Sequence, residues 1–169
     1  NVGVARRHGV TVLEDSSKAG LDALLAIRND TAKRRDLNRK SRRYFADILR
    51  EFGPRAQLFF AELAGQRLAS ALVLRFGDRA TYLYGGSLQA RREVMAPYLL
   101  HHEIMNRMAA KGCAAYDFWG VAPPGQADHE WARISEFKRK FGGIELGLVP
   151  VLDHVYDRQA YERYIQSVG

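Results

Sequence analysis

Apolar positions along the chain follow two periods, and each period predicts its own kind of element. Alternation or short apolar runs between turn residues predict strands, whereas recurrence at every third or fourth position predicts helices. By the first rule we expect strands at 9–15, 57–63, 67–76, 80–87, 113–121 and 144–152. By the second we expect helices at about 17–31, 41–53, 97–111, 131–143 and 156–166.

Turn and capping residues support these boundaries. Ser41 can cap the helix that closes at Gly53-Pro54, and Pro97 suits the first turn of the long helix after it. Short turns separate the three central strands, which predicts an antiparallel meander. Meander, long helix, strand, helix and strand is an order that resembles a GNAT-type acyltransferase domain. The fold class expected is therefore α/β (α+β), with a mixed, mostly antiparallel sheet flanked by helices.

Two tyrosines stand near the end of the last meander strand. Tyr82 and Tyr84 are two positions apart, so the period of a strand predicts that they share one face. Tyr84 directly precedes Gly85 and Gly86, where the backbone carries no side chain. We interpret this strand end as a place where a substrate can lie.

The composition is that of one soluble globular domain. The 169 residues are 47% hydrophobic and 27% charged, and no apolar stretch approaches the ~18 residues needed to cross a bilayer. No signal pattern is visible, so a cytoplasmic location is expected. The single cysteine, Cys113, excludes a disulfide within the chain and predicts a small buried side chain. The start at Asn1 indicates a fragment or a processed chain.

The chain is basic, and the excess is concentrated between Arg28 and Arg55. The formal net charge is +7 and the pI is about 9.8. Such charge favours anionic partners, which include RNA, anionic lipids and phosphorylated precursors, without choosing among them. The segment before Tyr44 is crowded with basic residues, which form either a solvated face or a phosphate- or carboxylate-binding group; they include Arg34, Arg35, Arg39, Lys40, Arg42 and Arg43.

The stretch 131–143, WARISEFKRKFGG, places a lysine on an apolar helix face. Lys138 falls on one side with Ile134, Phe137 and Phe141, whereas Arg139 and Lys140 point elsewhere. In one interpretation the stem of Lys138 covers core surface while its ammonium reaches water. In the other, the ammonium is held beside an aromatic wall to stabilise negative charge on a substrate.

Several motifs in order resemble the FemABX family of aminoacyl transferases, which build peptidoglycan cross-bridges from aminoacyl-tRNA. They are YLYGGS at 82–87, the helix beginning APYLLHHEIM, YDFWGV at 116–121 and the spacing F-K-x-x-F-G-G. The resemblance covers most of the chain from about Leu24 onward. It implies that residues 1–169 are a single GNAT-like domain, the second half of a two-domain protein. One departure is Arg133, where the family often has a small residue.

The resemblance also implies a reaction. The amine of a stem peptide attacks the ester carbonyl of an aminoacyl-tRNA, and the acceptor is a nucleotide- or lipid-linked muropeptide, with contact at the inner face of the membrane. Lys138 would stabilise the oxyanion, and Phe137 would exclude water from the surroundings of this lysine. Arg139 and Lys140 would steer the tRNA. The residues expected to bind the precursor are Arg35, Tyr44, Tyr84 and Tyr98.

No cofactor or metal is expected. The loop SLQARREVMAPY has no glycine after Gly86, so its backbone is poorly suited to close on the pyrophosphate of CoA. His101 and His102 are adjacent and face different directions on a helix, which disfavours a zinc site. Asp117, a carboxylate at a strand end, is more typical of a turn than of a general base.

Two other functions fit the same sequence. The first is a GNAT-like N-acyltransferase with another acyl donor, which the element order alone supports. The second is a non-catalytic module that binds RNA or anionic lipid through its basic face. The oligomeric state is not indicated by the sequence.

Overall fold

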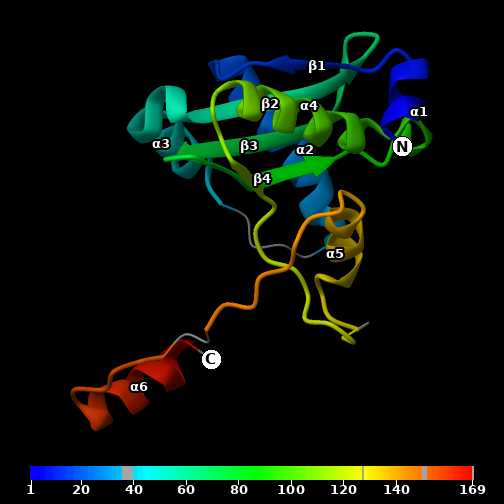
Figure 1. Ribbon diagram of the computed structural model, residues 1–169. Coiled ribbons are helices and arrows are strands. Elements are labelled where there is room, and N and C mark those ends of the chain that lie inside the picture. Colours follow the sequence, from blue (N-terminus) through cyan, green and yellow to red (C-terminus); the bar gives the residue numbers. More distant parts are fainter. Residues whose placement is uncertain (36–39, 127, 150–151, 169) are drawn as a thin grey trace. The chain divides into compact units, whose positions relative to one another are not determined.

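The computed structural model describes residues 1–35, 40–126, 128–149 and 152–168, and only the backbone of residues 32–35 and 168 (Figure 1). The chain forms two compact units, Asn1–Gly120 and Val121–Gly169. The first unit contains a five-stranded sheet in the order β1-β2-β3-β4-β5. Its strands are β1 (Thr11–Glu14), β2 (Ala56–Leu63), β3 (Gln66–Phe76), β4 (Arg79–Ser87) and β5 (Ala115–Asp117).

Helices cover both faces of this sheet. The helices of the first unit are α1 (Val2–Arg7), α2 (Lys18–Arg35), α3 (Arg42–Phe52) and α4 (Ala96–Ala110), with single 3₁₀ turns η1 (Gly53–Arg55) and η2 (Arg92–Val94). On one face, Leu100 and Ile104 of α4 pack with Phe59 of β2. On the other face, α2 and α3 supply a second buried cluster, which includes Leu24 and Phe45. In Figure 1, α4 crosses one face and α2 lies behind the sheet.

Most predicted elements are confirmed. The predicted mixed, mostly antiparallel sheet is present: β1 to β4 pair antiparallel, and only β4 and β5 pair parallel. Ser41 caps α3 through a hydrogen bond that its side chain accepts from Tyr44 N at 3.1 Å. The helix α2 extends past the expected end at residue 31 to Arg35, and α1 was not predicted.

The prediction that Tyr82 and Tyr84 share one face of the sheet is wrong. Leu72 of β3 pairs with Tyr84, and the next residue, Val73, pairs with Tyr82, so Leu83 is an extra residue in β4. Such a bulge reverses the alternation of side chains. Tyr82 therefore packs with the α4 cluster, whereas Tyr84 packs with the α2 and α3 cluster.

The strands β4 and β5 separate soon after they meet. Only Arg79–Thr81 pairs with Ala115–Asp117, so within the described residues Tyr82–Ser87 has no strand partner on that side. The predicted strand 113–121 is thus reduced to three residues, and Cys113 is half-buried instead of buried. The end of β4 is consequently open on the side away from β3.

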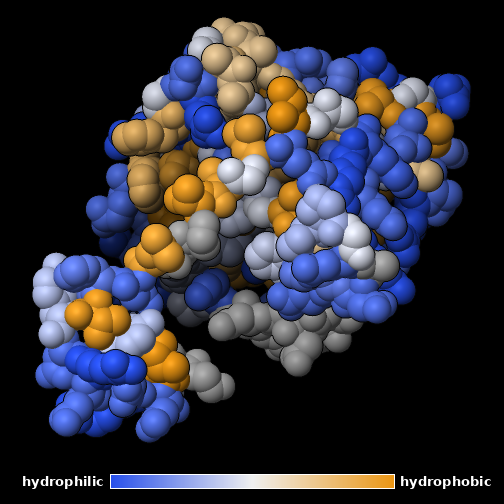
Figure 2. Space-filling model, turned by 60° about the horizontal axis from the view of Figure 1, so that its bottom comes forward, coloured by the Kyte–Doolittle hydropathy of each residue, from blue (hydrophilic) through white to orange (hydrophobic). Residues whose placement is uncertain are grey.

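The second unit contains two helices, α5 (Ala132–Arg139) and α6 (Arg158–Val168). The predicted strand at 144–152 is wrong for its described residues, which form no regular element. Ile144, Leu148 and Val149 are 86–89% exposed, and a strand needs a neighbour to pair its backbone groups. The surface of α6 also carries apolar side chains among polar ones (Figure 2). None of the described helices combines the length and apolar content that crossing a membrane requires.

Candidate functional site

Two predicted substrate-binding tyrosines meet at the open end of β4. The hydroxyls of Tyr44, in α3, and Tyr84, in β4, are 2.8 Å apart and share a hydrogen bond. The rings contact edge to face, with centroids 5.9 Å apart, and Phe45 packs against both. Tyr44 is 38% exposed, so the hydroxyl pair lies at the surface. Burial raises the pKa of Tyr84 to about 12, and the hydrogen bond to Tyr44 adds to this shift, so the Tyr84 hydroxyl keeps its proton at neutral pH.

Two cations flank this pair of tyrosines. The guanidinium of Arg28, in α2, lies over the rings of Tyr84 and Phe45, with its carbon 4.9 and 5.2 Å from the centroids. Its Nη1 donates to the carbonyl oxygen of Gly85 at 3.4 Å. The ammonium of Lys40 lies 5.6 Å from the centre of the Tyr44 ring. We call Arg28, Lys40, Tyr44 and Tyr84 the tyrosine site.

Close packing of α2 on β4 holds Arg28 in this place. A Cβ at Gly86 would lie 2.7 Å from Thr31 Oγ1, so only glycine allows the helix to approach this closely. The Thr31 hydroxyl donates to Ile27 O at 3.0 Å and accepts from Ser87 N at 3.3 Å. The Gly85-Gly86 pair therefore matters for helix approach as well as for leaving the backbone bare.

A second polar group lies on the opposite, α4 face. His101 is 2% exposed, and its Nδ1 lies 2.9 Å from the hydroxyl of Tyr116 in β5. The rings of Tyr82 and Phe118 pack against His101 at 4.5 and 5.1 Å. Burial raises the pKa of Tyr116 well above its ordinary value. Within the described residues no group of three His, Cys, Asp or Glu side chains could hold a metal ion.

The residues of the face predicted for the helix at 131–143 are partly buried, although α5 ends at Arg139, before Phe141. Ile134, Phe137, Lys138 and Phe141 are half-buried, and the rings of Phe137 and Phe141 contact edge to face at 5.3 Å. Arg139 instead pairs with the carboxylate of Glu145 and donates to Ala122 O at 3.0 Å. Its hydrogen bonds lower the pKa of Glu145. Lys138 is therefore half-buried, as expected of a residue on that face, whereas Arg139 is already paired with Glu145.

The remaining predicted residues lie elsewhere. Arg35 ends α2, and its side chain is outside the described residues. Tyr98 is half-buried in the first turn of α4, the helix on the face opposite Tyr44 and Tyr84. Lys140 is exposed just after α5. Asp117 accepts a hydrogen bond from Trp119 N at 2.7 Å, which fits the predicted turn role.

Arg28 and the contact of His101 with Tyr116 were not predicted as site features. For Arg28 a signal exists, since it falls in the helical stripe with Leu21, Leu24 and Leu25. A charged residue within an apolar stripe needs a specific surrounding. For His101 the partner lies on another element, so the sequence offers no comparable signal.

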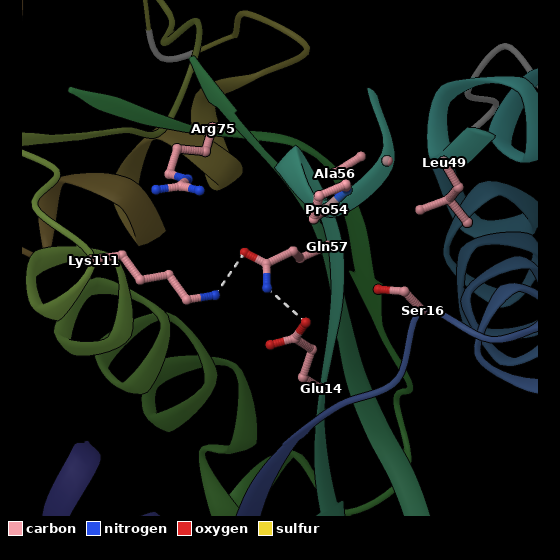
Figure 3. A pocket seen from close by; sticks show the side chains of 9 residues that line it. Glu14, Ser16, Leu49, Pro54, Ala56, Gln57, Arg75 and Lys111 are labelled. Atoms are coloured by element: carbon pink, nitrogen blue, oxygen red, sulfur yellow. Dashed lines mark hydrogen bonds between the residues drawn. The ribbon is translucent and has the colours of Figure 1, made fainter. Parts of the chain in front are cut away.

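A hollow of about 420 Å³ lies at the start of β2 (Figure 3). Gln57 is buried at its floor, where Lys111 Nζ donates to its Oε1 at 3.1 Å and its Nε2 donates to Glu14 at 2.6 Å. These bonds join the end of α4 to β1 and β2. None of the residues of the tyrosine site lines this hollow, and its central polar groups satisfy one another. We assign it a structural role.

Several backbone N–H groups at the start of α4 and in the loop before it donate to carbonyl oxygens of that same loop. Val94 N donates to Arg91 O, Met95 N to Arg92 O and Tyr98 N to Met95 O, at 3.0–3.2 Å. Pro97 has no N–H to offer. Few backbone donors therefore remain at this helix N-terminus for a phosphate.

Known proteins are similar to this chain in sequence and in fold. Residues 3–139 match the family model described as "Acetyltransferase (GNAT) domain". The chain is 26% identical over 162 residues to the UDP-N-acetylmuramoylpentapeptide-lysine N(6)-alanyltransferase of Weissella viridescens, covering 95% of this chain and 47% of that protein. It is 28% identical over 101 residues to the lipid II:glycine glycyltransferase of Staphylococcus epidermidis, covering 60% and 24%.

The fold comparison agrees. The crystal structure of FemX superposes with a TM-score of 0.77 at 19% identity, covering 83% of this chain and 52% of that one. A possible acetyltransferase from Clostridium difficile superposes with a TM-score of 0.62 at 9% identity, covering 88% and 99%. The chain spans about half the length of the Weissella relative. The family model shows that the chain belongs to the acetyltransferase (GNAT) domain family, and the matches to FemX and to the two transferases support a domain of the FemABX type.

Proposed function

We propose that this chain is the second GNAT-type domain of an enzyme that transfers an amino acid from aminoacyl-tRNA to an amine of a peptidoglycan precursor. The observation that carries the proposal is the tyrosine site, where two hydroxyls 2.8 Å apart lie beside two cations. Such a surface suits a precursor that carries carboxylates and phosphates. The names of the relatives, an alanyltransferase and a glycyltransferase, support the same reaction class.

Lys138 is proposed to stabilise the oxyanion of this reaction. An aminoacyl ester is already activated, so the protein chiefly aligns the amine with the carbonyl and stabilises the negative charge that develops on the carbonyl oxygen. The new amide forms as the tRNA hydroxyl leaves. Lys138 is half-buried and follows Phe137, whose ring contacts that of Phe141. Apolar rings near an ammonium would lower the local polarity and strengthen its interaction with an oxyanion.

The donor is proposed to be aminoacyl-tRNA and not acetyl-CoA. Few backbone N–H groups remain here to bind a CoA pyrophosphate, because those of Val94, Met95 and Tyr98 donate within the loop and Pro97 has none. The net charge of +7 favours a polyanionic donor, and the exposed Lys140 is available to its phosphates. With a lipid-linked precursor, the reaction would take place in the cytoplasm at the inner face of the membrane.

The test uses the full-length protein with charged tRNA and either a UDP-linked or a lipid-linked muropeptide. We expect amino-acid transfer, and we expect Lys138→Ala to slow it by about a hundredfold, as the loss of one oxyanion donor costs ~3 kcal/mol of barrier. Lys18→Ala, at the exposed first residue of α2, is the matched control and should transfer at the normal rate. An unchanged rate in Lys138→Ala would remove this lysine from the mechanism.

Two further outcomes would replace the proposal. Saturable micromolar binding of acetyl-CoA would make the chain an N-acyltransferase with that donor. Salt-dependent RNA binding without transfer from any donor would make it a binding module.

A further inference from the structure

We propose that Arg28 is an anion-binding residue, and that the tyrosine site receives a carboxylate or phosphate group of its ligand through the free edge of this guanidinium. The identity of that ligand as a precursor rests on the function proposed above. The binding of an oxyanion itself rests only on the contacts of Arg28.

Most donors of Arg28 have no partner among the described residues. A guanidinium has five N–H groups, and here Nη1 donates to Gly85 O at a long 3.4 Å. Within the described residues no carboxylate pairs with Arg28, whereas Arg42 pairs with Asp22 and Arg50 with Asp47 and Glu51. Arg28 thus differs from these two arginines of α3.

The unused donors are open to a ligand. In the described part of the chain, Ser70 Oγ is the only fully enclosed side-chain polar atom that lacks a hydrogen-bond partner. The Nε and Nη2 atoms of Arg28 therefore reach solvent. These two atoms form the edge that pairs with both oxygens of a carboxylate or phosphate.

The aromatic rings fix the guanidinium without occupying this edge. Tyr84 and Phe45 contact Arg28 through ring faces, with distances of 4.9 and 5.2 Å to the centroids. Burial lowers the pKa of Arg28, because the cation is partly removed from water, and no carboxylate among the described residues pairs with it. A bound oxyanion would supply a counter-charge.

The neighbouring groups suit the same ligand. Tyr44 and Tyr84 share one hydrogen bond, so one of the two hydroxyl hydrogens is left to donate to a ligand. Lys40 adds a second positive charge near Tyr44. The donors offered by this site therefore all favour an oxyanion.

The experiment is an NMR titration of the 169-residue protein labelled with ¹⁵N, observed at the Nε–Hε resonance of Arg28. The probes are N-acetyl-alanyl-alanine, its C-terminal amide, and inorganic diphosphate. We expect a saturable shift with one or both anions and none with the amide. A response to the peptide alone identifies a carboxylate as the group recognised, and a response to diphosphate alone identifies a phosphate. An Arg28 resonance that neither anion moves would overturn the proposal.

Variants provide a second readout. Arg28→Lys keeps the charge but removes the two-atom edge, so we expect the affinity for the anion to fall about tenfold or more. The ion-paired Arg50→Lys is the control and should bind as the original protein does. Wild-type affinity in Arg28→Lys would refute a role for the edge. Anion binding without any amino-acid transfer by the full-length protein would count against the proposed function alone.

Discussion

Gly86 controls how closely α2 lies against β4, and we predict that Gly86→Ala destabilises the protein strongly. The new Cβ would lie 2.7 Å from Thr31 Oγ1 and 3.3 Å from Ile27 O. The second contact is with helix backbone, which cannot rotate away. The first contact displaces a hydroxyl that bonds both Ile27 O and Ser87 N, at 3.0 and 3.3 Å.

The magnitude follows from these contacts. Each lost hydrogen bond costs about 1 kcal/mol, and forcing an extra methyl group into a filled space costs about 1–3 kcal/mol. With both hydrogen bonds lost, the free energy of unfolding should therefore fall by about 3–5 kcal/mol. With a urea dependence of about 2–3 kcal/mol/M for a chain of this size, the unfolding midpoint should fall by roughly 1–2 M.

Urea unfolding followed by far-UV circular dichroism measures this change. Gly143→Ala is the matched control, because a Cβ at Gly143 meets no atom within 4 Å, and its stability should change by less than about 0.5 kcal/mol. Thr31→Ala removes the atom in closest conflict, so in that background Gly86→Ala should cost at least ~1 kcal/mol less. Equal costs of Gly86→Ala in both backgrounds would refute the steric argument.

Two smaller effects can be checked on the same protein. Because the pKa of Tyr84 is about 12 in the folded chain and about 10 in an unfolded one, the folded state keeps this proton longer, and stability is lost as the pH rises from 10 to 12. Tyr84→Phe should lose less stability over that interval in urea unfolding at each pH, and an identical decline would contradict the assignment. Ser41→Ala removes the cap of α3 and should lower the free energy of unfolding by about 1 kcal/mol, whereas Ser167→Ala near the C-terminus of α6 should not change it.

Local chemistry made the helices and the meander predictable. The start of α3 depends on one hydroxyl, that of Ser41, and its end on the positive φ of Gly53, and both signals stand in the sequence next to the element that they bound. The contact between the Phe137 and Phe141 rings likewise joins residues four positions apart in the sequence. These features need no knowledge of distant segments.

Features that depend on a neighbouring strand were not predictable. Residues 144–149 alternate as a strand does, yet Ile144 and Leu148 are 89% and 86% exposed, because alternation alone supplies no partner for the backbone. The contacts of Arg28 were not predictable either, because they depend on segments that are distant in the sequence. The aromatic rings beside Arg28 come from α3 and β4, so the sequence places this arginine in an apolar stripe but does not reveal its contacts.

The bulge at Leu83 explains why the two tyrosines near the end of β4 lie in different environments. Without the extra residue, Tyr82 and Tyr84 would point to the same face, and the Tyr84 hydroxyl could not reach Tyr44 on α3. With it, Tyr84 joins a surface that is cationic and open to solvent, whereas Tyr82 packs against the buried His101. Gly85 completes the arrangement, because a Cβ there would collide with the Tyr82 ring and Ser70 O. A ligand bound by Arg28 is therefore held on the open face of β4, while the aromatic rings around His101 keep the other face of the same strand closed.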